Sequence, residues 1–113
     1  MRFGESAEFL ADLKRLERKY PRLRDDLAAL NTGPPPRIDQ VPGFGGRLLK
    51  VRVPSRDMQR GASGGFRLLL YVGGPEVDPK LWALALYPKA ERADMGRDEI
   101  KRRLGRLFDF LRR

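Results

Sequence analysis

Three segments between residues 48 and 87 alternate apolar and other residues with a period of two. This alternation is typical of β-strands whose two faces meet different surroundings, and it constrains the fold more than any other feature. The segments run from Leu48 to Val53, from about Phe66 to Val72 and from about Leu81 to Tyr87. Short links separate them, which predicts an antiparallel sheet.

The residues around these strands predict three helices. Apolar residues three or four positions apart predict a helix over residues 9–20. Pro21 ends this helix and begins a second one over residues 23–30, so that the two form a helical hairpin. A third, very basic helix is expected from about Arg97 onward. The connector of residues 37–46 contains Pro-Gly and Gly-Gly breakers and is expected to be a loop.

The order helix, helix, strand, strand, strand, helix predicts an α+β fold. We expect an N-terminal helical hairpin packed on a small antiparallel β-sheet of three or more strands, with a C-terminal helix. The 113 residues fit a single domain over residues 1–113. The first six residues contain no apolar signal core, and no stretch approaches the roughly 20 apolar residues of a membrane span. A soluble cytoplasmic protein is therefore expected.

The chain is strongly basic and lacks two residue types that are common in catalysis. Lysine and arginine outnumber aspartate and glutamate by 24 to 15, which gives a formal net charge of +9 and favours an anionic partner such as a nucleic acid. The absence of cysteine excludes disulfides, thiol catalysis and cysteine-ligated zinc. The absence of histidine removes the commonest general acid and base. Any catalysis must therefore use lysine, arginine, tyrosine, hydroxyl or carboxylate groups.

The strand region carries basic and phenolic side chains rather than a metal-binding set. Its acidic residues, Asp57, Glu76 and Asp78, fall in expected loops and form no cluster of oxygen ligands, so we expect no metal ion and no other cofactor. Strand alternation places basic and phenolic residues on one face of each strand. These pairs are Lys50 with Arg52, Arg67 with Tyr71, and Tyr87 with Lys89. If the three faces coincide in the sheet, they form a positive pocket on a rigid floor.

Such a pocket can cleave RNA without a metal ion. The 2′-hydroxyl attacks the neighbouring phosphorus, and fixed arginine and lysine groups stabilise the charge that builds on the phosphoryl oxygens. Arginine is too basic to accept the hydroxyl proton, whereas neighbouring positive charges lower the pKa of a lysine. Lys50 or Lys89 is therefore the preferred base, with Tyr87 next. Tyr71 is expected to stack on a base of the RNA.

These residues also have structural interpretations. Lys50 and Arg52 fit the solvated side of a half-exposed strand, and Arg67 fits a structural salt bridge inside an apolar run. The loop of residues 55–65 fits either an anion-binding loop or an ordinary connection between strands. The basic last helix fits a solubilising surface.

Two strand motifs resemble those of a known toxin family. The run from Arg60 to Tyr71, RGASGGFRLLLY, resembles the SGG-aromatic-Arg strand of RelE/HigB-like toxins in the RelE/ParE superfamily. The run from Leu84 to Arg92, LALYPKAER, resembles their leucine-rich Tyr-x-Lys-x-Glu strand end. In addition, Lys50-Val51-Arg52 fits their Lys-x-Arg strand, and Asp98-Glu99-Ile100-Lys101 resembles the start of their last helix.

The resemblance implies a RelE-like fold and the toxin of a bacterial type II toxin–antitoxin pair. Many such toxins cut messenger RNA in the ribosomal A site without a metal ion, and a cognate antitoxin protein silences them. The catalytic or substrate-binding residues that it implies are Lys50, Arg52, Arg67, Tyr87 and Lys89. Further RNA-binding residues are expected at Arg56, Arg60, Tyr71, Lys14 and Arg18. The expected partners are an antitoxin, mRNA and the ribosome, and the free toxin is expected to be a monomer or a weak dimer.

Two other functions fit the same residues. A ParE-like protein has a similar fold but inhibits DNA gyrase by binding it, without cutting RNA. A non-catalytic RNA-binding module would keep RNA affinity and its salt dependence but leave the RNA intact. The basic strand residues and the Tyr-x-Lys strand end favour RNA cleavage over gyrase inhibition.

Overall fold

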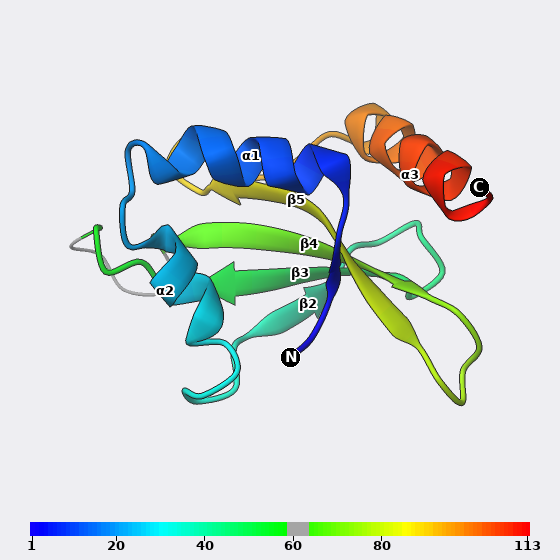
Figure 1. Cartoon of the computed structure of the whole chain (residues 1–113), viewed down its shortest axis with the longest axis horizontal. Coiled ribbons are helices and arrows are strands. Elements are labelled where there is room, and N and C mark those ends of the chain that lie inside the picture. Colours follow the sequence, from blue (N-terminus) through cyan, green and yellow to red (C-terminus); the bar gives the residue numbers. More distant parts are fainter. Residues whose placement is uncertain (59–63) are drawn as a thin grey trace.

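The computed structural model describes residues 1–58 and 64–113, whose strands form one sheet with helices on both faces (Figure 1). The elements in chain order are β1 (Gly4–Glu5), α1 (Ala7–Glu17), α2 (Leu23–Ala28), β2 (Ile38–Gln40), β3 (Leu48–Val53), β4 (Phe66–Gly73), β5 (Lys80–Pro88) and α3 (Arg97–Leu111). The strands lie in the order β1, β5, β4, β3, β2. None of the helices described is long and apolar enough to cross a membrane.

The fold is α+β, but the expected arrangement of a helical hairpin first, on an antiparallel sheet, is wrong. The chain begins with β1, which pairs in parallel with β5 through Gly4 opposite Trp82 and Glu5 opposite Ala83. The sheet is therefore mixed, with five strands among the described residues. A strand of two residues shows no alternation and so carries no strand signal. Gly4 permits the pairing, because a Cβ at this position would lie 2.6 Å from the ring of Trp82.

The segment of residues 37–46, which was expected to be a loop, contributes strand β2. Its three residues pair antiparallel with β3, with Ile38 opposite Val51, Asp39 opposite Lys50 and Gln40 opposite Leu49. The glycines that indicated a loop follow the strand, and Gly43, Gly45 and Gly46 there adopt positive φ. A strand this short, between two proline-containing stretches, is hidden by its neighbours in the sequence.

Helices bury both faces of the sheet, so β4 is buried along most of its length. The core of the first face consists of Phe9, Leu13, Leu16, Leu23, Val51, Val53, Phe66, Leu68, Leu70, Ala83 and Leu86, from α1, α2 and the strands. The core of the second face, called the α3 face below, includes Leu48, Leu69, Leu84, Ala85, Tyr87, Ile100, Leu104 and Leu107. Helix α3 runs along β5 from Ile100, close to Tyr87, to Phe110, whose ring packs on Trp82.

Asp12 of α1 and Arg103 of α3 form an ion pair at the edge of β5. They cover the part of this edge that lies beyond Trp82 and Ala83, the two residues that pair with β1. The Leu86 N–H donates to Asp12 Oδ2 at 3.0 Å, and Arg103 Nη1 donates to the Leu84 carbonyl at 3.1 Å. Arg103 Nη1 also lies 2.7 Å from Asp12 Oδ2. Burial lowers the pKa of Arg103, but the hydrogen bond and charge of Asp12 outweigh burial and raise the pKa overall. The pair thus satisfies two backbone groups at an otherwise open sheet edge.

We predict that Asp12→Ala lowers the free energy of unfolding by about 3 kcal/mol, because a partly buried guanidinium and a strand N–H lose their acceptor. The matched control is Asp109→Ala, which removes an exposed pair with Arg112 and should cost less than about 0.5 kcal/mol. Urea unfolding at neutral pH measures both changes. Equal losses in the two variants would show that the ion pair does not hold β5.

Candidate active site

The register of the sheet aligns three arginines and a tyrosine across four strands or their ends. Arg52 of β3 lies opposite Arg67 of β4, and Arg67 lies opposite Tyr87 of β5. Arg37, directly before β2, extends this line, because its carbonyl accepts the Arg52 N–H at 3.0 Å. Residues directly opposite one another in a sheet share a face. We call Arg37, Arg52, Arg67 and Tyr87 the arginine–tyrosine row, and it lies on the α3 face.

Of the two lysines predicted from the sequence, Lys50 lies on the same face as the row. Lys50 stands two residues before Arg52 in β3, and its Nζ lies 2.6 Å from Asp94 Oδ1. Lys89 is exposed in the turn directly after β5, and its backbone N–H donates to the Gly65 carbonyl at 3.0 Å. The structure therefore brings four of the five residues implied as catalytic, Lys50, Arg52, Arg67 and Tyr87, to one face of the sheet.

A cavity of about 320 Å³ opens beside the row on this face. Lys50, Tyr87 and the carboxylates Asp39 and Asp94 line it, and Ile100 of α3 is also among its walls. Asp39 lies directly opposite Lys50, two register positions along from the row. This volume is at the lower end of the range for small-molecule sites. The cavity therefore combines a cation, a phenol and two carboxylates in a space of nucleotide scale.

The hydroxyl of Tyr87 is buried without a hydrogen bond to any described residue, and the side chain as a whole is 3% exposed. Burial raises the pKa of Tyr87, and the negative charge of Asp94 raises it further. The Met95 N–H opposes this shift without meeting the geometry of a hydrogen bond, and the positive charge of Arg67 opposes it as well. The phenol is therefore protonated at neutral pH and can act as a hydrogen-bond or proton donor.

Arg67 is a buried cation beside a second cation. It is only 3% exposed, and its Nη1 donates to the Phe66 carbonyl at 3.1 Å. Burial lowers the pKa of Arg67, as does the charge of Arg52, whereas the charges of Tyr87 and Asp39 oppose the shift. An arginine keeps its charge under any physiological condition. A fixed positive charge is therefore held inside the sheet face.

The other residues predicted to bind RNA that the structure describes do not line the cavity beside the row. Lys14 and Arg18 are exposed on and just after α1, which covers the opposite face of the sheet. Tyr71 shares the α3 face but packs its ring on Phe108, with the ring centroids 5.2 Å apart. Arg56 lies beside α2, where its Nε is 3.7 Å from Asp26 Oδ1. The prediction for Arg60 lies outside the described residues.

Sequence reasoning missed the acidic members of the site and one of its arginines. Arg37 and Asp39 alternate in phase, but a three-residue strand within a loop-like segment gave no reason to weigh that alternation. Asp94 lies in the link between β5 and α3, 44 residues from its partner Lys50. No pattern in the sequence indicates a contact between residues so far apart.

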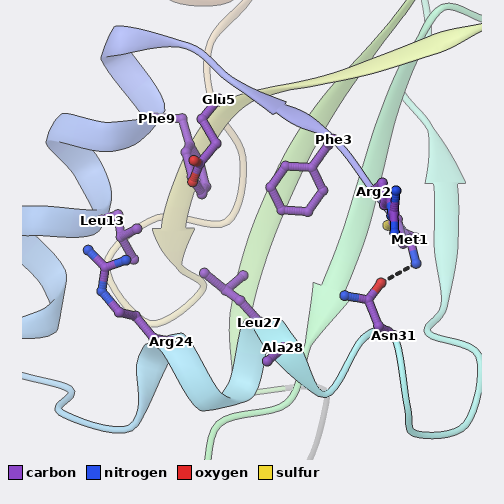
Figure 2. Close-up of a pocket in the computed structure, with 10 residues that line it drawn as sticks. All are labelled: Met1, Arg2, Phe3, Glu5, Phe9, Leu13, Arg24, Leu27, Ala28 and Asn31. Atoms are coloured by element: carbon purple, nitrogen blue, oxygen red, sulfur yellow. Dashed lines mark hydrogen bonds between the residues drawn. The ribbon is translucent and has the colours of Figure 1, made fainter.

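A second cavity, of about 410 Å³, lies between the N-terminal segment, α1 and α2 (Figure 2). Figure 2 shows the apolar side chains Phe3, Leu13 and Leu27 around it, and the Met1 ammonium donates to Asn31 Oδ1. Arg24 of α2 also lines this cavity, and its Nε lies 2.7 Å from Glu17 Oε2. This cavity is on the opposite face from the row and gathers no comparable set of reactive groups.

Comparison with known proteins adds no assignment to this geometry. The chain matches no known family model and no curated protein. Among residues 1–58 and 64–113, no group of three or more acidic residues is placed to hold a metal ion.

We predict that Tyr87→Phe raises the free energy of unfolding by about 1 kcal/mol at neutral pH, because it removes a buried hydroxyl that has no hydrogen-bond partner among the described residues. The control is Tyr71→Phe at a half-buried position, which should give no gain. Chemical denaturation measures both variants. A loss of stability in Tyr87→Phe would mean that the hydroxyl is satisfied in solution.

We further predict that the gap between Tyr87→Phe and the wild type widens above about pH 10. The pKa of Tyr87 is raised from its ordinary 10.0 in the folded protein, so the unfolded chain releases the phenol proton first. The stability linked to that proton is complete below about pH 10 and is lost as the pH rises further. Denaturation measured from neutral to alkaline pH gives this gap. A gap that stays constant would show that burial does not shift the phenol.

Proposed function

We propose that this protein is an endoribonuclease that cleaves mRNA without a metal ion, as the toxin of a type II toxin–antitoxin pair. The observation that carries the proposal is the arginine–tyrosine row, with Lys50 on the same face. The motifs of β4 and of the end of β5, which resemble those of RelE/HigB-like toxins, meet in this row through Arg67 and Tyr87. The proposal includes mRNA on the ribosome as substrate, a silencing antitoxin as partner and the cytoplasm as the site of action.

The energetics of the row favour an anionic ligand. Like charges directly opposite one another in a sheet are destabilising, and Arg52 and Arg67 form such a pair. A phosphodiester between the guanidiniums would relieve this repulsion, because arginine grips phosphate oxygens through paired hydrogen bonds. An arrangement that costs stability in the free protein is a typical sign of a binding site.

The chemical step follows from these positions. The 2′-oxygen of the RNA attacks the adjacent phosphorus and forms a 2′,3′-cyclic phosphate, and the bond from phosphorus to the 5′-oxygen breaks. Arg52 and Arg67 stabilise the negative charge that develops on the phosphoryl oxygens. Tyr87 donates its proton to the departing 5′-oxygen, and the charge of Arg67 then favours the phenolate. Water restores the phenol proton after the products leave.

We assign the acceptor of the 2′-hydroxyl proton to the Asp94 carboxylate rather than to a lysine. Asp94 Oδ1 lies 2.6 Å from Lys50 Nζ, so Lys50 is engaged in holding that carboxylate. Asp94 borders the same cavity as Tyr87, and its charge acts on the phenol. A general base and a general acid thus lie in one cavity, as a displacement at phosphorus requires.

We predict that Arg67→Ala lowers the rate of RNA cleavage by about 10²- to 10³-fold, the usual effect of removing one preorganised group that stabilises a transition state. Arg112→Ala is the control, because Arg112 is exposed and pairs only weakly with Asp109. Primer extension on mRNA from programmed ribosomes gives both rates. Because Arg67 is buried, Arg52→Ala is tested beside it at a half-buried position, with the fold checked by circular dichroism.

Three outcomes would contradict the proposal in different ways. Equal losses in Arg67→Ala and Arg112→Ala would put the active site elsewhere. Growth arrest with an intact mRNA pool would favour a gyrase inhibitor of the ParE type. RNA that is bound in a salt-dependent way but never cut would favour a non-catalytic RNA-binding module.

A further inference from the structure

A third cavity adjoins the arginine–tyrosine row where β3 ends. It has a volume of about 320 Å³ and lies between the end of α2, the segment that leads into β2 and the residues that follow β3. Figure 1 shows these three parts together at one end of the sheet. Arg37 and Arg52 belong both to the row and to the lining of this cavity. The cavity therefore borders the row at these two arginines.

The walls of this cavity are apolar and rigid. Leu30 and the three consecutive prolines Pro34, Pro35 and Pro36 form one side, and Pro54 contributes to the other. Proline fixes its own φ and has no N–H to offer, so such a wall excludes water without competing for hydrogen bonds. We call this space the proline cavity. Its size and apolar lining fit a planar ring of the size of a nucleobase.

Two arginines of the proline cavity are paired with carboxylates: Arg37 Nε lies 3.5 Å from Asp39 Oδ2, and Arg56 is held by the buried Asp26. The Arg56 N–H lies 3.2 Å and 3.3 Å from the two oxygens of Asp26, and the Asp26 side chain is 2% exposed. Burial raises the pKa of Asp26, and the Arg56 N–H and charge oppose that shift. The Arg56 side chain is 59% exposed, so its guanidinium can meet a phosphate at the cavity rim.

We propose that the proline cavity is a nucleotide subsite, which receives one unstacked base of the RNA next to the scissile phosphate. Arg37 and Arg56 contact the phosphate of that nucleotide, and the apolar wall covers its base. Single-stranded RNA is the occupant that this chemistry selects, because its bases are free to leave the stack and its phosphates match the arginines. The inference rests on the proposed function and extends it from the cleaved bond to the neighbouring nucleotide.

The test uses two variants of the full chain with matched controls. Ala29→Phe fills the proline cavity, whereas Ala28→Phe places the same ring at the adjacent position, which lines the cavity of Figure 2 instead. Arg56→Ala removes the rim cation, and its control, Arg24→Ala, removes another exposed arginine that forms an ion pair. Circular dichroism and chemical denaturation verify the fold, and Arg56→Ala carries the test if Ala29→Phe does not fold.

The probe is a short RNA with 2′-O-methyl riboses, which block the attacking oxygen, labelled for fluorescence anisotropy. We expect Ala29→Phe and Arg56→Ala to raise its Kd about tenfold, the size of the loss of one stacked base, and the two controls to leave it unchanged. Replacing the nucleotide beside the cleavage position with an abasic one should weaken binding to the wild type by a similar factor. The same replacement should have no effect on Ala29→Phe.

The outcomes separate the subsite from the proposed function. If the abasic probe binds the wild type as tightly as the complete one does, while unmodified RNA is still cut, the subsite is wrong and the nuclease stands. If the wild type binds the probe with the expected variant pattern but never cuts RNA, the subsite stands and the nuclease is wrong. If the wild type neither binds nor cuts RNA, both proposals are wrong.

Discussion

The ion pair of Asp12 and Arg103 holds β5, a strand that contributes side chains to the cores on both faces of the sheet. Asp12 comes from the helix over one face and Arg103 from the helix over the other, so the pair ties the two layers together around the strand edge. Both side chains also bind the β5 backbone, at Leu84 and Leu86. Tyr87 follows directly in the chain, so this pair and the pairing of β5 with β4 together position the phenol in the candidate site.

The candidate site departs from the rules that the rest of the sheet follows. Leu68 lies opposite Leu86 as an apolar pair, and Asp39 lies opposite Lys50 as a pair of opposite charges, whereas Arg52 meets Arg67. The hydroxyl of Tyr87, moreover, finds no hydrogen-bond partner in the described part of the chain. Both features cost stability in the free protein, and both would gain from a phosphodiester that offers negative charge and an acceptor oxygen. Local rules are broken most often where a protein binds or reacts.

Alternation within a strand was enough to predict that Lys50 shares a face with Arg52, because parity is a local property. The register that puts Arg52 beside Arg67 depends on pairing between distant segments, and no local pattern specifies it. The strand β1 was invisible because two residues show no period, although Gly4 marks the close approach to Trp82. The sequence does contain an indication that α3 covers the second face of the sheet. Leu69 is apolar although it shares a face of β4 with Arg67 and Tyr71, and apolar residues on both faces are typical of a strand buried on both sides.

The two parts of the proposed site differ in how they are built. The groups assigned to chemistry mostly stand on paired strands, whose backbone hydrogen bonds hold Arg67 and Tyr87 in a fixed relation. The walls assigned to base recognition come from the connecting segments around Pro34–Pro36 and Pro54. Connecting segments tolerate change more readily than paired strands do, so base preference can vary while the cleavage geometry stays the same. Arg52 joins the two parts, because it is paired within the sheet and also borders the proline cavity.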